Sequence, residues 1–223
     1  MVLALLIGTI LFGVTLRFAH PTGVEALPFV AVWVAQVLHA PCSIAYHTFM
    51  CMSPKVANFW RRMDLTFVLV LNLLTTFALG YFTWGLRGVL VSCAIDAVIV
   101  LVGIYNVMHL KEGQPVDRVK VVTLIGISAL GYYVPVTYRG IGAAISGRFW
   151  LEFAAALLMI ICHSAGGACY ALHWPQRQFP VVFDRCGFSH NIMHVALFFC
   201  YNTAYPYLWW ELTNKHAWAP LWP

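Results

Sequence analysis

The sequence predicts an all-α, polytopic membrane protein: a single bundle of seven transmembrane helices formed by residues 1–223. Two observations support this prediction. The chain is 61% hydrophobic and only 9% charged, with a mean hydropathy of +0.79, whereas a soluble domain carries about 25% charged residues. Its apolar residues also fall into stretches of about 20, the length that crosses the hydrocarbon core of a bilayer.

The first two predicted helices lie at about residues 1–19 and 24–52, on either side of the sequence His-Pro-Thr-Gly. Cleavage of the first stretch as a signal peptide would leave six helices. We expect a retained helix, because the stretch lacks a positive n-region and a small-residue cleavage site. The second stretch contains Pro41, which a transmembrane helix tolerates because neighbouring helices satisfy the freed carbonyl.

The other five predicted helices follow polar connections that are rich in glycine, proline and basic residues. These connections are SPKVANFWRR, WGLRG, KEGQPVDRVK, RGIGAAISGR and PQRQFPVVFDRCG. The helices after them are expected at about 64–85, 88–110, 120–138, 149–174 and 189–212. The last residues form a stretch rich in Trp and Pro, which is typical of a membrane interface.

The basic residues predict how the bundle is oriented. With a cytosolic N-terminus, eight of the 13 Lys and Arg residues lie on the cytosolic side and five on the other. Cytosolic loops carry the excess of Lys and Arg, so we expect the N-terminus in the cytosol and the C-terminus on the opposite side. The net charge of +5 is therefore no sign of nucleic-acid binding, and no nucleic-acid partner is expected.

Three segments far apart in the sequence bring polar residues to one predicted depth. His47 lies near the cytosolic end of the second helix, Asp64 begins the third, and His190 and His194 begin the seventh. His190 and His194 share a helical face, as do Ser43 and His47, because residues four apart are neighbours on a helix. Three imidazoles at one depth suit Zn²⁺, which in catalytic sites takes three protein ligands and a water. Asp64 could hold that water or orient a ligand.

Each of these features also has a structural explanation. Two histidines four residues apart are by themselves a weak sign of a metal, and Ser43 could hydrogen-bond the carbonyl four residues earlier. Asp64 lies close to Arg61 and Arg62 and could be an interfacial ion pair or a helix-start acid. The convergence of the three segments favours the metal site.

As a set, these residues resemble the progestin and adipoQ receptor (PAQR) family, which includes the hemolysin III-like proteins and belongs to a superfamily with the alkaline ceramidases. The resemblance extends over essentially the whole chain, including the segment CMSPKVANFWRRMDLTFVL. It implies that His47, His190 and His194 bind Zn²⁺, that Asp64 lies next to the zinc-bound water, and that Ser43 is a further polar group of the site. It also implies a cavity between the helices that accepts a lipid chain.

Two hypotheses of function follow. In the first, the protein is a zinc-dependent hydrolase that cleaves the amide bond of a ceramide-like membrane lipid, with Asp64 as general base and Ser43 as a donor to the oxyanion. In the alternative, it is a membrane receptor or a lipid-binding protein. The zinc would then be structural, with a side chain such as Asp64 completing its coordination.

Other polar residues leave further possibilities open. A haem protein would pair histidines such as His39 and His163 across the bundle, whereas a retinal protein is disfavoured because the seventh helix has no Lys for a Schiff base. A transporter stays open because Asp96 and His163 are ionisable and lie mid-span. We expect these two to form a buried hydrogen-bonded pair between the fourth and sixth helices. Glu152 begins the sixth helix, where the helix dipole favours an acid.

Overall fold

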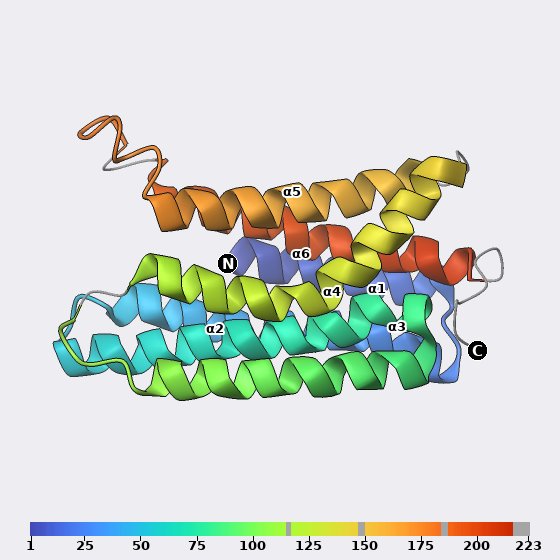
Figure 1. Ribbon diagram of the computed structural model, residues 1–223, viewed down its shortest axis with the longest axis horizontal. Coiled ribbons are helices and arrows are strands. Elements are labelled where there is room, and N and C mark those ends of the chain that lie inside the picture. Colours follow the sequence, from blue (N-terminus) through green and yellow to red (C-terminus); the bar gives the residue numbers. More distant parts are fainter. Residues whose placement is uncertain (115–116, 147–149, 184–186, 216–223) are drawn as a thin grey trace.

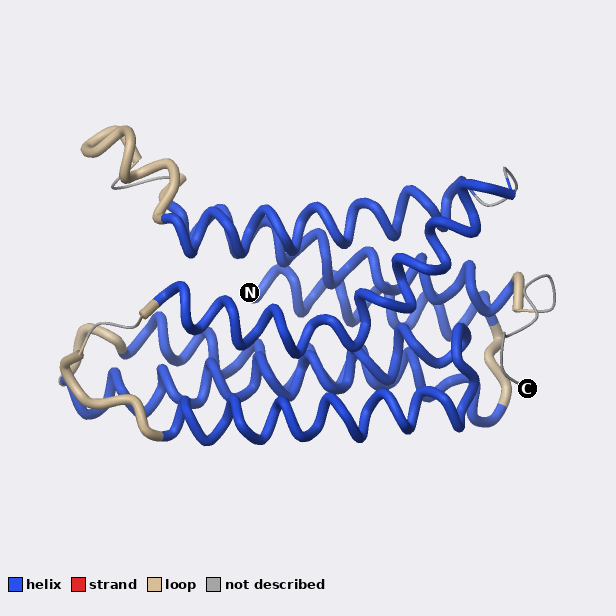
Figure 2. Tube along the Cα trace, viewed as in Figure 1, coloured by secondary structure: helices blue, strands red, loops and turns tan. Residues whose placement is uncertain are grey.

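The computed structural model describes residues 1–114, 117–146, 150–183 and 187–215. This part of the chain is helical, with loops between the helices (Figure 2). A short 3₁₀ helix, η1 (Gly23–Ala26), precedes the second of six α-helices. In chain order these are α1 (Val2–Ala19), α2 (Leu27–Phe49), α3 (Pro54–Met108), α4 (Arg118–Ser146), α5 (Trp150–Leu172) and α6 (Ser189–Thr213). Figure 1 shows them bundled along the longest axis of the molecule.

Helix α3 folds back on itself at Gly85. This residue has φ 66° and ψ 175°, a backbone conformation that is essentially restricted to glycine. The arms 54–84 and 86–108 lie side by side in Figure 1, and Leu69 of the first packs against Val100 and Val107 of the second. The bend therefore falls at the end of the stretch predicted at 64–85, just before the stretch predicted at 88–110.

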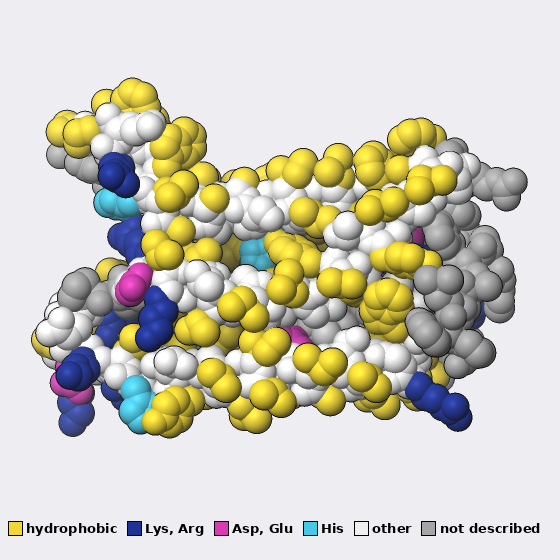
Figure 3. All heavy atoms as spheres, in the orientation of Figure 1, with side chains coloured by type: hydrophobic (Ala, Val, Ile, Leu, Met, Phe, Trp, Pro, Cys, Tyr) yellow, Lys and Arg dark blue, Asp and Glu magenta, His cyan; other side chains and the backbone are white. Residues whose placement is uncertain are grey.

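Five helical segments of the described chain are long and apolar enough to cross a membrane: α1, η1 with α2, α3, α4 and α5. Helix α6 is not among them, since polar side chains such as His190, His194 and Glu211 interrupt its apolar sequence. Hydrophobic side chains cover most of the flank in Figure 3, while Lys and Arg gather mainly at the end with the α2–α3 and α3–α4 connections.

Two predicted boundaries are wrong. Helix α3 begins at Pro54 and not at residue 64, because the Ser53 hydroxyl caps it by accepting a hydrogen bond from the Val56 backbone N–H at 3.3 Å. Proline is also favoured in a first helical turn. The connection predicted at 139–148 is helical up to Ser146, since part of it is buried against its neighbours. The predicted helix start at residue 149 lies outside the described residues, as do residues 216–223 of the C-terminal stretch rich in Trp and Pro. The earlier part of that stretch belongs to α6 up to Thr213.

The core of the bundle lies between α2, α3, α4, α5 and α6. Its largest fully buried side chains include Phe29, Leu79, Tyr205 and Tyr207. Helix α4 contains Pro135, which removes a backbone hydrogen bond from the helix, and in Figure 1 the second half of α4 bends toward α5. A cavity lies between α2, the first arm of α3, α4, α5 and α6, toward the end where α2 stops and α6 begins.

Candidate metal centre

Three imidazoles meet near one end of the bundle. His47 comes from the last turn of α2, and His190 and His194 come from the first two turns of α6. The Nε2 atom of His47 lies 3.1 Å from Nε2 of His194 and 3.2 Å from Nε2 of His190. One ring nitrogen from each histidine falls within 4.8 Å of the other two. The structure thus brings together the three histidines that the sequence places at one depth.

The spacing of these nitrogens fits a metal ion. One proton can join only one pair of imidazole nitrogens at a time, so hydrogen bonding alone leaves a third lone pair facing the group. A tetrahedral ion with Zn–N bonds of about 2.0–2.1 Å separates its ligand nitrogens by about 3.3 Å, close to the two distances observed. Imidazole suits zinc as well as several other transition metals.

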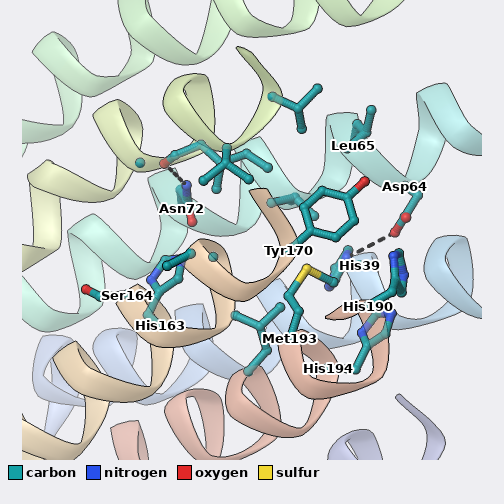
Figure 4. A pocket seen from close by; sticks show the side chains of 18 of the residues that line it. His39, Asp64, Leu65, Asn72, His163, Ser164, Tyr170, His190, Met193 and His194 are labelled. Carbon is teal, nitrogen blue, oxygen red and sulfur yellow. Dashed lines mark hydrogen bonds and ion pairs between the residues drawn. The ribbon is translucent and has the colours of Figure 1, made fainter. Parts of the chain in front are cut away.

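Asp64 lies beside this group and outside its ligand set. The residue comes from the first arm of α3, is 9% exposed, and lines the same cavity as His190 and His194. Its Oδ1 atom lies 3.2 Å from Nε2 of His39 on α2 (Figure 4). Among the described residues, the group able to hold a metal contains the three histidines and no carboxylate.

The arginines near Asp64 have other partners, so the ion pair that was considered as an alternative for Asp64 does not form. Arg61 donates to the backbone carbonyls of Lys111 and Gln114, and Arg62 donates to that of Leu110. Both arginines therefore hold the α3–α4 connection, and His39 takes the place beside Asp64.

Sequence reasoning considered His39 only as a haem ligand and missed its contact with Asp64. A signal was present: His39, Ser43 and His47 are spaced by four residues and so lie on one face of α2. The face predicted from Ser43 and His47 extends one turn further, and that turn meets Asp64.

Ser43 is fully buried on α2, one turn before His47. Its hydroxyl oxygen has no hydrogen-bond partner among the described residues, so the bond to the carbonyl four residues earlier, which was considered as an alternative, is not formed. Ser43 is also not one of the residues that line the neighbouring cavity. Its contribution to the site stays a prediction.

A cavity of about 220 Å³ adjoins the centre. Figure 4 shows His163 and Ser164 on the side of this cavity away from His190 and His194. Between these polar ends the lining is mostly apolar and comprises residues such as Leu65, Val68, Val122, Ile125, Met193 and Leu197. Such a cavity can hold an apolar chain whose polar part lies near the histidines.

The expected pair between Asp96 and His163 is wrong. The Thr76 hydroxyl donates to Oδ2 of Asp96 at 2.8 Å, because the bend in α3 places these residues opposite each other. Nδ1 of His163 lies 2.6 Å from the Tyr132 hydroxyl. His39 and His163, a pair considered for haem, also have separate partners.

A second buried charge cluster joins α4, α5 and α6. The Arg139 Nε–H lies 2.9 Å from Oε1 of Glu152 and 3.2 Å from Oε1 of Glu211, and the three residues are at most 2% exposed. The hydroxyls of Tyr207 and Thr83 donate to Glu211 at 3.1 and 3.3 Å. Glu152 is therefore more than a helix-start acid: it is half of a carboxylate pair around one guanidinium.

Comparison with known proteins agrees with these features. A family model described as "Haemolysin-III related" matches residues 1–205. An adiponectin receptor protein of Drosophila melanogaster is 23% identical over 201 residues, which cover 86% of this chain and 45% of the relative. The chain thus spans less than half the length of that relative. The family match includes Ser43, His47, Asp64, His190 and His194.

Proposed function

The chain belongs to the haemolysin-III related (PAQR) family of integral, multi-pass membrane proteins, and from this premise we propose that it is a zinc-dependent hydrolase of a ceramide-like lipid amide. One observation carries the proposal: three imidazole nitrogens meet beside a buried carboxylate and an apolar cavity. Nε2 of His47 lies 3.1 and 3.2 Å from the Nε2 atoms of His194 and His190.

We place seven spans in the membrane, with the two arms of α3 as separate spans and α6 as the last. Helix α3 comprises 55 residues including Gly85, more than twice the roughly 20 residues that one span requires. Helix α6 turns its polar side chains toward the three-histidine group and the Arg139 cluster. The end rich in Lys and Arg faces the cytosol in this proposal, which puts the N-terminus in the cytosol, the C-terminus on the opposite side and the histidines near the cytosolic surface.

In this proposal His47, His190 and His194 would hold Zn²⁺, as three protein ligands do in catalytic zinc sites. The position of Asp64 outside the group of nitrogens supports an open site. When bound, the ion would supply a Lewis acid that lowers the pKa of water toward neutrality and polarises a carbonyl.

The oxygen of a water molecule bonds to the amide carbonyl carbon, and Asp64 accepts the proton that this water loses. When the carbon–nitrogen bond breaks, Asp64 passes that proton to the nitrogen, so a fatty acid and a free amine leave and the carboxylate is regenerated. Ser43, whose hydroxyl has no partner among the described residues, is proposed to donate a hydrogen bond to the carbonyl oxygen as it becomes negative. Because Ser43 is fully buried and does not line the cavity, this role requires the carbonyl to enter beyond the cavity lining toward α2. The apolar cavity positions the acyl chain and excludes water from it.

Asp64→Asn tests this assignment. We expect the zinc-loaded variant, purified in detergent, to lose ceramide hydrolysis by about 100-fold or more, because a positioned general base contributes about 10²–10⁴-fold. With zinc in excess, its zinc content should stay at the parental level, since the three histidines and not Asp64 form the ligand group. Hydrolysis at the parental rate by the zinc-loaded variant would remove Asp64 from the mechanism.

The relative is named an adiponectin receptor protein, and this name favours a receptor as the second candidate. In this candidate the cavity binds a lipid and the zinc is structural. The purified chain would then bind a ceramide-like lipid without cleaving it. Removal of zinc by a chelator would lower its thermal stability and lipid binding together. Product release measured on the parental protein separates the two candidates.

A further inference from the structure

His39 and Asp64 form a buried pair between α2 and the first arm of α3. His39 is 2% exposed, and its Nε2 atom lies 3.2 Å from Oδ1 of Asp64. An ionised carboxylate can only accept hydrogen bonds, so Nε2 carries the proton and donates it. Among the described residues, His39 is the hydrogen-bond partner of the Asp64 carboxylate.

The other nitrogen of His39 argues against a role in packing alone. Nδ1 is buried and has no hydrogen-bond partner among the described residues. A buried polar atom without a partner costs free energy, and an apolar side chain at this position would avoid that cost. The contact with Asp64 is the polar interaction that the imidazole gains here.

The pair of His39 and Asp64 lies outside the three-histidine group but faces the same cavity. His39 lies eight residues before His47, about 12 Å further along the axis of α2, and is not part of the metal-binding group. It nevertheless lines the same cavity as Asp64, His190 and His194 (Figure 4). Its hydrogen bond engages Oδ1 and leaves Oδ2 of Asp64 to act in the cavity.

We propose that His39 is a positioning residue of this centre, which orients the Asp64 carboxylate beside the metal through its Nε2–H. The inference rests on the proposed zinc hydrolase and adds a residue that acts through Asp64. Groups that support a metal site from outside its ligands are worth about 10–100-fold in metal affinity or activity. In this proposal Asp64 is such a group, and His39 acts on both quantities through Asp64.

The test compares His39→Leu, which removes the donor, with His39→Gln, whose side-chain amide can donate from a similar position. Two readouts are taken on zinc-loaded protein in detergent: the rate of zinc release to an excess of chelator, and the kcat and KM of ceramide hydrolysis. His39→Leu is also made in the Asp64→Asn background. The matched control is Gln36→Leu, which removes a buried polar side chain one turn earlier on α2 that hydrogen-bonds Tyr201 and Tyr205 and does not contact Asp64.

We expect His39→Leu to release zinc about 10-fold faster and to lower kcat by about 10-fold or more with little change in KM. His39→Gln and Gln36→Leu should stay close to the parent. In the Asp64→Asn background, His39→Leu should have no further effect on zinc release. Parental zinc release and kcat in His39→Leu, or an undiminished effect without Asp64, would overturn the proposal. If the parent binds zinc but releases no product, the hydrolase fails, and the zinc-release measurements still decide the role of His39.

Discussion

In the described part of the chain, two small groups of side chains bring buried charged residues together, while the buried Asp96 is bonded separately to Thr76. Near one end, Asp64 is paired with His39 beside the three imidazoles. Near the other, Arg139 lies between Glu152 and Glu211. An ionised group away from water is tolerated only with a partner and with its hydrogen bonds satisfied, so each of these residues depends on the others in its group.

Arg139→Met is predicted to destabilise the protein strongly, because it leaves two carboxylates buried without their guanidinium. Loss of one partner from a buried ion pair costs about 3–5 kcal/mol, and we expect a decrease of that size in the free energy of unfolding in detergent. Arg87→Met is the matched control, since Arg87 is exposed, and it should change stability by less than about 0.5 kcal/mol. Equal stability of the two variants would show that the cluster contributes nothing to folding.

At the scale of the helices, the fold depends on where each helix stops and what it faces. Gly85 turns α3 back so that its second arm packs on the first, and this turn puts Thr76 beside Asp96. Ser53 starts α3 early enough for Arg61 and Arg62 to hold the α3–α4 connection. The first arm of α3 is thereby fixed beside α2, which brings Asp64 to His39.

Gly85→Ala tests the turn in α3. An added Cβ would meet no atom within 4 Å, so any loss of stability comes from the backbone conformation alone, at about 1–3 kcal/mol. Gly13→Ala provides the control, because Gly13 lies in α1 with equally open surroundings and alanine there should hold or raise stability by up to about 1 kcal/mol. Thermal unfolding of both variants in detergent measures the difference. A Gly85→Ala variant as stable as Gly13→Ala would contradict this account of the turn.

Some of these features could be read from the sequence and others could not. His190 and His194 were predicted because their spacing and depth depend on α6 alone, and His47 because α2 ends at nearly the same depth. The partner of Asp96 was predicted wrongly, since it depends on which helices are neighbours. Glu152 looked like a helix-start acid because sequence position does not reveal the approach of Arg139 from α4 and Glu211 from α6. The start of α3 was missed because Ser53 and Pro54 are typical of a loop as well as of a capped helix.

At the scale of the whole molecule, the three-histidine group and the Arg139 cluster lie at opposite ends of the bundle. His190 and Glu211 lie 21 residues apart on α6, which corresponds to about 32 Å along the helix, or about the thickness of the hydrocarbon core of a bilayer. The Arg139 cluster fastens α4, α5 and α6 at one end. The histidines of α2 and α6 and the carboxylate of α3 then converge at the other end, beside a cavity suited to an apolar chain.

The central claim is that the three histidines bind zinc, and metal analysis of the detergent-purified protein tests it most directly. The parental chain is compared with a His190→Ala/His194→Ala variant. We predict about one zinc per chain in the parent and none in the variant, because one imidazole cannot replace the three ligands of such a site. Absence of metal from both, with unchanged stability, would make the histidines packing residues and contradict the hydrolase proposal as well.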